Sequence, residues 1–138
     1  MTYRSERLDD KEKLARFASD KSHYRIADNS VKPRAFDPQR RISAELQIIE
    51  TSVSRVDGCS ESEIWEMGDA AFVARQKLAI ARSNIFVNQV RATGLMVVAD
   101  EPPVRHAVIS GWPSDDVEIE TKMKELAAIA TLTMRILP

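Results

Sequence analysis

Cationic side chains in extended segments are the residues of this sequence best suited to chemistry. Lys32 and Arg34 flank a proline, and they share one side of their segment if it is extended. Arg55 lies in ETSVSRV, whereas Arg105 and His106 lie in VRHAVIS. An arginine fork binds two oxygens of a phosphate at once, so cations that converge would form an anion pocket. The residues that we expect to bind a ligand are Lys32, Arg34, Arg55 and Arg105.

His106 is the candidate for an acid or base. Alternation along VRHAVIS places His106, Val108 and Ser110 on one face of the expected strand. A histidine changes its charge near neutral pH, so it can donate or accept a proton there. The alternative is a structural histidine that is hydrogen-bonded beneath Trp112 or a helix, and the sequence leaves both interpretations open.

Other catalytic arrangements have little support. The soft metal ligands are His23, His106 and Cys59, and no two of them have the spacing of a zinc site. We therefore expect neither a metal nor a cofactor. A helix is expected to begin just after Cys59, and a helix N-terminus activates a thiol, but a small residue at a turn explains this position as well. The four glycines are scattered singly and form no phosphate-binding loop.

Positive charge is concentrated in one segment. The chain has a net charge of -1, yet residues 21–41 carry six basic and two acidic side chains. Residues 42–138 carry nine basic and fourteen acidic side chains. A basic segment in a near-neutral protein marks either a contact with an anion or an ordinary solvated loop, and both remain open. The near-neutral total argues against a broad nucleic-acid surface.

Length and composition are those of one globular domain. The chain has 138 residues, of which 43% are hydrophobic and 30% charged. Its longest nearly apolar stretch, residues 126–134, is far shorter than the roughly 20 residues of a membrane span. The N-terminus lacks the apolar core of a signal peptide, and a single cysteine excludes an internal disulfide. We therefore expect one cytoplasmic domain, with residues 1–20 attached to it loosely through a short helix.

Capping residues and apolar spacing predict the helices. Ser60 is followed three residues later by a glutamate, which forms a capping box and is typical of a helix start. Gly68 is placed to end that helix. The longest apolar stripe has helical spacing up to Leu137. The expected helices are 8–19, 60–68, 83–93 and 114–138.

Segments rich in β-branched residues predict strands between these helices. Prolines at 33 and 38 exclude a helix interior, so residues 31–41 are expected to be extended. The expected strands are 22–28, 46–56, 95–99 and 104–110, with a strand or a helix at 77–81. Residues 77–99 fit a βαβ unit, whereas the two strands around the Pro102-Pro103 turn fit an antiparallel pair. We therefore expect an α+β fold, in which a long C-terminal helix and two shorter helices pack on a small mixed or antiparallel sheet.

Four segments together resemble a group of small uncharacterised bacterial hypothetical proteins. Those proteins contain V-K-P-x-A-F, S-V-x-R, S-E-x-E-I-W and R-H-A-x-I-x-G-W-P, and this chain has VKPRAF, SVSR, SESEIW and RHAVISGWP. The resemblance covers about residues 23–113. It implies a bacterial source and a single structural unit. It supplies no catalytic residues, because no activity is established for the group.

Three classes of function fit these observations. The first is binding of a phosphate-bearing ligand, a nucleotide or a nucleic acid, through the basic segment. The second is an interaction or structural subunit of a bacterial complex, or a homodimer, with an exposed apolar face. The third is a small enzyme with His106 as acid or base, which requires a pocket that also contains Lys32, Arg34 or Arg55 to hold an anionic substrate. No membrane partner is expected.

Overall fold

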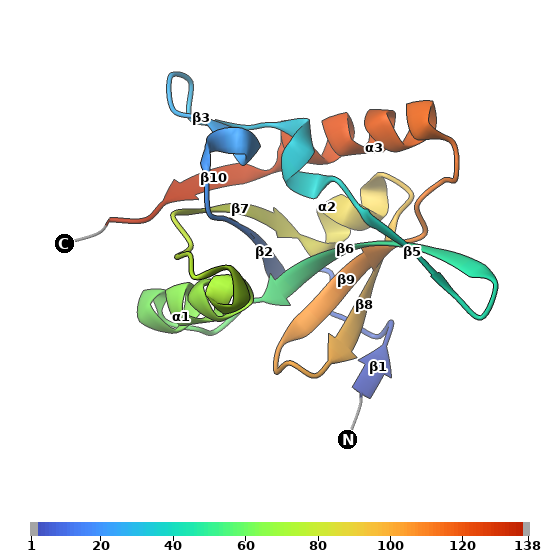
Figure 1. Cartoon of the computed structure of the whole chain (residues 1–138), viewed down its shortest axis with the longest axis horizontal. Coiled ribbons are helices and arrows are strands. Elements are labelled where there is room, and N and C mark those ends of the chain that lie inside the picture. The colour runs from blue at the N-terminus through green and yellow to red at the C-terminus, as the bar shows by residue number, and fades with distance from the viewer. Residues whose placement is uncertain (1–2, 137–138) are drawn as a thin grey trace.

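One antiparallel sheet organises the protein in the computed structural model, which describes residues 3–136. Its strands follow the order β1-β8-β9-β6-β2-β7-β10, and β5 pairs with β6 beside this path (Figure 1). The expected α+β fold is confirmed, and every pairing within this sheet is antiparallel. The eight strands are β1 (Tyr3–Ser5), β2 (Lys13–Ala18), β5 (Gln39–Ser43), β6 (Leu46–Arg55), β7 (Ala81–Phe86), β8 (Met96–Glu101), β9 (His106–Ser110) and β10 (Thr131–Met134).

Three α-helices and three short 3-10 turns complete the fold. The capping box expected at Ser60 begins α1: the Ser60 hydroxyl accepts from the Glu63 N–H at 3.1 Å, and the Glu63 carboxylate accepts from the Ser60 N–H at 2.9 Å. None of the helices in residues 3–136 is long and apolar enough to cross a membrane. The helical elements are α1 (Glu61–Phe72), α2 (Val87–Ala92), α3 (Asp116–Ile129), η1 (Lys21–His23), η2 (Pro33–Phe36) and η3 (Val73–Arg75). The two remaining strands, β3 (Tyr24–Arg25) and β4 (Ser30–Val31), pair with each other.

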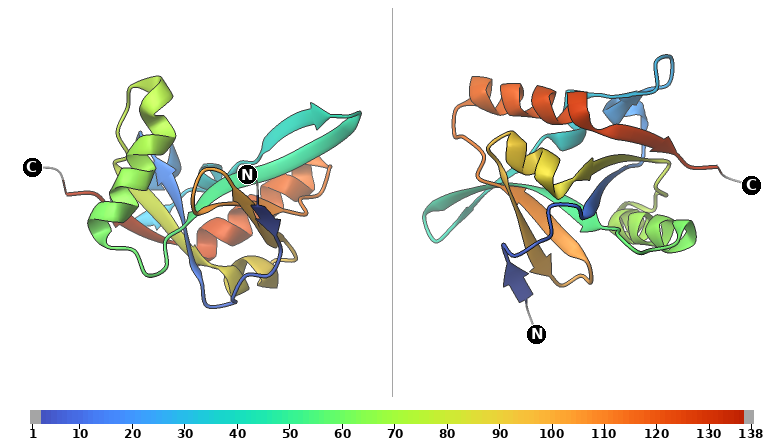
Figure 2. Two further views of the ribbon diagram at one scale, coloured as in Figure 1. Left: turned by 90° about the horizontal axis from the view of Figure 1, so that it is seen from below. Right: turned by 180° about the vertical axis from the view of Figure 1, so that it is seen from behind.

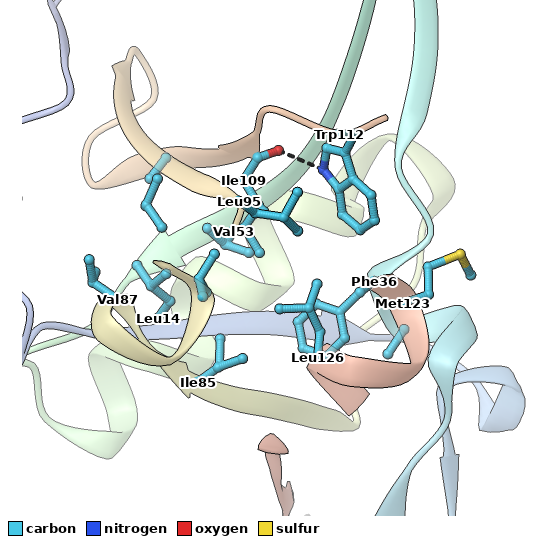
Figure 3. Close-up of a cluster of buried hydrophobic side chains, with 14 of the residues drawn as sticks. Leu14, Phe36, Val53, Ile85, Val87, Leu95, Ile109, Trp112, Met123 and Leu126 are labelled. Atoms are coloured by element: carbon cyan, nitrogen blue, oxygen red, sulfur yellow. Dashed lines mark hydrogen bonds between the residues drawn. The ribbon is translucent and has the colours of Figure 1, made fainter. Parts of the chain in front are cut away.

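Apolar side chains fill both faces of the central strands. In β2, Leu14 joins the core beneath α2 and α3, whereas Ala15 and Phe17 join a second core beneath α1. Neighbouring residues of a strand point to opposite faces, so α1 lies on one face of the sheet and α2 and α3 lie on the other (Figure 2). The larger core surrounds Phe36 and Leu126, which are both fully buried (Figure 3). Burial of such side chains stabilises the fold by about 1.5–3 kcal/mol each.

Arg16 occupies an opening between β2 and β6. These strands pair only at Leu14 and Ala15 of β2. Beyond that point the Arg16 guanidinium lies between them, where its Nε donates to the Ala35 carbonyl at 3.1 Å and its Nη1 donates to the Ser52 carbonyl at 2.9 Å. Arg16 therefore gives a partner to a β6 carbonyl that has lost its neighbouring strand, and it ties η2 to the sheet.

Two of the expected helices contain strands instead. Residues 13–18 of the expected helix 8–19 form β2, in which Leu14 and Ala15 are both buried. A strand buried on both faces has no alternating pattern, so periodicity alone does not separate it from a helix. The expected helix 83–93 begins only at Val87, because the preceding residues form β7, which pairs with β2 and β10.

The C-terminal part of the fold also differs from expectation. The last helix is the longest, as expected, but α3 ends at Ile129 and the chain then enters β10, where threonines favour a strand. Leu137 of the expected stripe lies outside the described residues. Residues 81–101 form strand, helix and strand, as the expected βαβ unit at 77–99 requires, but three strands separate β7 from β8, so the two are not neighbours in the sheet. The expected strand 22–28 is reduced to the two residues of β3, which follow η1.

Gly68 lies inside α1, against the sheet, instead of ending the helix. A Cβ at this position would stand 2.7 Å from both Ala79 Cβ and Phe17 Cδ1. Replacement of a helix glycine by alanine normally stabilises a protein by about 1 kcal/mol, but overpacking costs about 1–3 kcal/mol. We predict that Gly68→Ala lowers the free energy of unfolding in urea, whereas Ala70→Gly, at an exposed position of α1, reports helix propensity alone. A Gly68→Ala protein as stable as the wild type would contradict this close packing.

Candidate functional site

An open groove lies between η1, η2 and α3. The first two of these elements belong to the basic segment, residues 21–41. Its volume is about 580 Å³. Three cations of that segment, Arg25, Lys32 and Arg34, line it together. The complete lining is Ser22, Arg25, Lys32, Pro33, Arg34, Asp37, Glu120 and Met123. Two of the four residues that we expect to bind a ligand therefore lie side by side in one groove.

Local hydrogen bonds hold the two 3-10 turns of the groove together. The Asp20 side chain caps η1 by accepting from the Ser22 N–H at 2.8 Å. The Lys32 N–H donates to the His23 carbonyl at 2.9 Å, which fixes the start of η2 beside η1. The chain between them folds back as the β3–β4 ribbon. Residues 20–32 therefore fold back on themselves, which places Arg25 and Lys32 in the same groove.

Buried residues anchor η2 while its cations face outward. Pro33 occupies the first position of the turn, where its fixed φ suits a helical start. Ala35 and Phe36 are fully buried, whereas Arg34 is exposed. The Thr51 hydroxyl of β6 donates to the Phe36 carbonyl at 2.9 Å. The apolar half of PRAF thus locks the turn onto the sheet and leaves its arginine available to a ligand.

The three cations of the groove have no carboxylate partner within the described chain. Among residues 3–136, no Asp or Glu oxygen lies within 4.0 Å of Arg25, Lys32 or Arg34. Asp37 and Glu120 line the same groove and partly balance its charge. By contrast, a carboxylate pairs with each of Arg4, Arg40, Arg41, Arg55, Arg82, Arg91 and Arg135. The groove therefore presents positive charge that the fold does not use.

Arg16 and His23 lie beside the groove and are partly buried. Burial lowers the pKa of Arg16, and the charge of Arg75 lowers this pKa further. Burial also lowers the pKa of His23, and the charge of Arg16 adds to that effect. The Nδ1 atom of His23 is buried without a hydrogen-bond partner among the described residues. The fold therefore favours the neutral form of His23.

We predict that protonation of His23 destabilises the fold. The pKa of His23 in the folded state lies below the ordinary 6.5, so the unfolded chain binds more protons as the pH falls below that value. The free energy of unfolding of the wild type should therefore decrease relative to that of His23→Gln as the pH falls through and below 6.5. At higher pH the difference between the two proteins should stay constant.

Urea denaturation at a series of pH values measures this difference. His106→Gln, at the second histidine of the sequence, controls for loss of an imidazole. A difference between wild type and His23→Gln that does not change with pH would show that His23 titrates alike in the folded and unfolded chains.

Arg55, Arg105 and His106 lie together at the far end of β6. Thr51 contacts η2, and Arg55 follows four residues later, about 13 Å along an extended strand. The Arg55 N–H donates to the Arg105 carbonyl at 2.8 Å, just before β9 begins at His106. The Arg55 guanidinium forms an ion pair with Glu12, with Nε and Oε1 2.5 Å apart. This carboxylate raises the pKa of Arg55 and occupies the fork that a ligand would need.

His106 lies between Asp100 and Ser54 on three neighbouring strands. Ser54 stands directly opposite His106 in the register of β6 and β9. The His106 Nδ1 atom lies 2.7 Å from the Asp100 carbonyl oxygen, which suits an Nδ1–H donor. That arrangement leaves Nε2 as the acceptor that a general base requires. No hydrogen bond joins His106 to Ser54 in the described part of the chain, and the acid–base role of His106 stays a prediction.

The structure thus divides the predicted residues into two groups that do not converge. Lys32 and Arg34 share the groove beside α3, whereas Arg55, Arg105 and His106 surround the junction of β6 and β9. Neither the groove beside α3 nor a second groove, along β6, contains Arg55 or His106. Arg55 lies close to His106, whereas Lys32 and Arg34 do not, and the enzyme hypothesis stays a prediction.

Six lining residues were not predicted from the sequence, namely Ser22, Arg25, Pro33, Asp37, Glu120 and Met123. Arg25 and Asp37 belong to the basic segment, so the charge count pointed to their neighbourhood. Glu120 and Met123 come from α3, where a spacing of three residues places them on one helix face. No local signal predicts that this face meets η2, because the contact depends on how α3 packs on the sheet.

Trp65 and Trp112 are core residues. The guanidinium carbons of Arg82 and Arg135 lie 4.8 Å and 5.3 Å from the centroid of the Trp65 ring. Such cation–π contacts contribute about 0.5–2 kcal/mol each. Trp112 joins the larger core, where its Nε1 donates to the Ile109 carbonyl at 3.0 Å (Figure 3). These indole rings support the fold and are not free to stack on a ligand.

Comparison of the chain with known protein families, with curated proteins and with solved structures found no significant match. Within residues 3–136, no group of three or more His, Cys, Asp or Glu side chains is arranged to hold a metal ion. The groove beside α3 is therefore interpreted from its own charges, shape and burial.

Proposed function

We propose that the protein binds a phosphate-bearing ligand of nucleotide size in the groove between η1, η2 and α3. The observation that carries this proposal is the convergence of Arg25, Lys32 and Arg34 on one groove without a carboxylate partner among the described residues. Phosphate oxygens accept hydrogen bonds from arginine forks and lysine ammonium groups. A phosphate would give these cations the partner that the fold does not provide.

The size and charge of the groove favour a nucleotide over a nucleic acid. A volume of about 580 Å³ lies within the ordinary range for small-molecule sites, and Pro33 and Met123 give the groove apolar surface for a ring. Asp37 and Glu120 would repel a long phosphate backbone that ran past the cations. The net charge of -1 likewise gives no broad attraction for a polyanion.

The geometry gives the enzyme hypothesis less support than binding. No histidine lines the groove, and its titratable residues are Asp37, Glu120 and the three cations. Ligand recognition is accordingly the function that this groove supports best.

We predict that charge removal in the groove weakens phosphate binding. The probes are pyrophosphate, AMP and ATP, titrated into isotopically labelled protein at low salt and followed by amide chemical shifts. Each charge-assisted hydrogen bond contributes about 1.5–3 kcal/mol, so Lys32→Ala and Arg34→Ala should each raise Kd by roughly tenfold to a hundredfold. Lys11→Ala removes one positive charge at an exposed site outside the groove and should leave Kd nearly unchanged.

Three results would contradict the proposal. The first is the absence of chemical-shift changes in η1, η2 and α3 at millimolar probe. The second is an equal loss of affinity in Lys11→Ala and Lys32→Ala, which would indicate general charge attraction. The third is preferential binding of a twelve-nucleotide single strand with a steep salt dependence, which would identify a nucleic-acid surface.

A further inference from the structure

The β5–β6 hairpin extends from the sheet as an arm, residues 39–50 (Figures 1 and 2). Its turn residues Ala44 and Glu45 both have positive φ, 50° and 66°, as in a two-residue type I′ turn. Ile42 and Leu46 beside the turn are 81% and 69% exposed. An isolated two-stranded ribbon is only marginally stable in water. Contact with another chain would therefore stabilise the arm.

One backbone edge of the arm is free. The Arg55 N–H donates on the β9 side of β6, and alternate residues of a strand direct their backbone groups to the same side. Gln47 and Ile49 therefore direct their N–H and C=O groups to that side as well. There β9 pairs only with residues 51–54 of β6. Within residues 3–136, no strand pairs with Gln47 or Ile49 on this side.

A groove of about 790 Å³ runs along this free edge. Met96, which is 44% exposed, and Val98 give it an apolar floor on the face of the sheet opposite α2 and α3. Gly111 borders the floor with a φ of +79°, a conformation that favours glycine. A Cβ at this position would lie 3.5 Å from Met96 Cε, so Met96 packs against Gly111 at the edge of the floor.

The charged residues of this groove largely neutralise one another. Arg4 Nη2 lies 2.8 Å from Glu50 Oε2, and Arg41 Nη2 lies 3.5 Å from Glu50 Oε1. Arg4 also pairs with Asp100 at 3.1 Å. The carboxylate of Glu50 therefore occupies the two arginines that line the groove. In this respect the groove differs from the one beside α3, where the cations have no carboxylate partner among residues 3–136.

We propose that this groove binds an extended, uncharged segment of a partner protein, which adds to the sheet as a strand beside Gln47 and Ile49. The free backbone groups of these two residues supply main-chain hydrogen bonds, and alternate side chains of the segment lie on Met96 and Val98. The internal ion pairs select against a charged segment, since a new charge would have to compete with Glu50 or with Arg4.

The same observations argue against other occupants. A phosphate would find the groove arginines already paired with a carboxylate. A second copy of the chain could pair through the outer edge of β5, where Arg40 and Ile42 direct their backbone groups away from β6. Hydrogen bonding of Arg40 to Ile42 of the other copy would place the two Arg41 side chains directly opposite, and like charges in that position are destabilising.

The proposal is tested with phage-displayed random heptapeptides selected on the wild-type protein. Enriched sequences are then synthesised and titrated calorimetrically into wild type and three variants. Gln47→Pro removes the N–H that faces the groove, and Ile42→Pro removes an N–H at the opposite edge of the same arm. Neither change removes a hydrogen bond between β5 and β6, so the two prolines form a matched pair. Met96→Lys places a charge on the exposed floor.

We predict enrichment of uncharged peptides, with at least tenfold weaker binding to Gln47→Pro and Met96→Lys and unchanged binding to Ile42→Pro. If Gln47→Pro perturbs the arm, as amide spectra would reveal, Met96→Lys decides the outcome alone. The proposal is wrong if no peptide is enriched, if the enriched peptides are charged, or if Met96→Lys binds them like the wild type. It is also wrong if sedimentation shows a dimer that Ile42→Pro abolishes, because the arm would then join two copies through β5.

Discussion

The separation of β2 from β6, and the arginine that fills it, is the constraint on which the rest of the structure depends. Two central strands that part after two residues leave carbonyl groups without partners, and Arg16 satisfies one of them together with the Ala35 carbonyl of η2. A planar guanidinium can donate in two directions at once, which a lysine in this place could not do as rigidly. Because Arg16 holds η2 in the opening, the cations that precede and follow Pro33 are fixed at the surface. The positive charge of Arg16 adds to the effect of burial in disfavouring a charge on His23.

The two grooves differ because the chain uses its charges differently on either side of the sheet. Beside α3, Lys32 and Arg34 lie at the start of η2, whose apolar residues point inward. No carboxylate of residues 3–136 pairs with either of them. Along the arm, Glu50 pairs with both Arg4 and Arg41, and the groove also offers the apolar side chains of Met96 and Val98 beside free backbone groups. The first arrangement suits oxygen-rich anions, and the second suits a polypeptide. Their separation allows both to be occupied at once, since the described linings share no residue.

Sequence reasoning succeeded where the signal is local. The β-branched run of β6, the capping box of α1 and the strands on either side of Pro102 and Pro103 all depend on neighbouring residues. It failed for β2, whose residues LARFA combine buried positions on both faces with an arginine that enters the interior, a pattern that resembles a short helix. The site was partly predictable for the same reason. Lys32 and Arg34 are brought together by a tripeptide, whereas the distance between them and Arg55 is set by how η2 docks on β6.

The strand order has a consequence for how the protein is made. β2 lies between β6 and β7, and β1 pairs with β8, so β1 and β2 receive their partners only after many further residues have been synthesised. At about 5–20 residues per second, the nascent chain spends several seconds with open strand edges and uncovered apolar surface. Such edges are templates for pairing with other chains. The sheet is complete only after β10 has been synthesised, which makes the preceding interval the period when chaperones and aggregation compete for the chain.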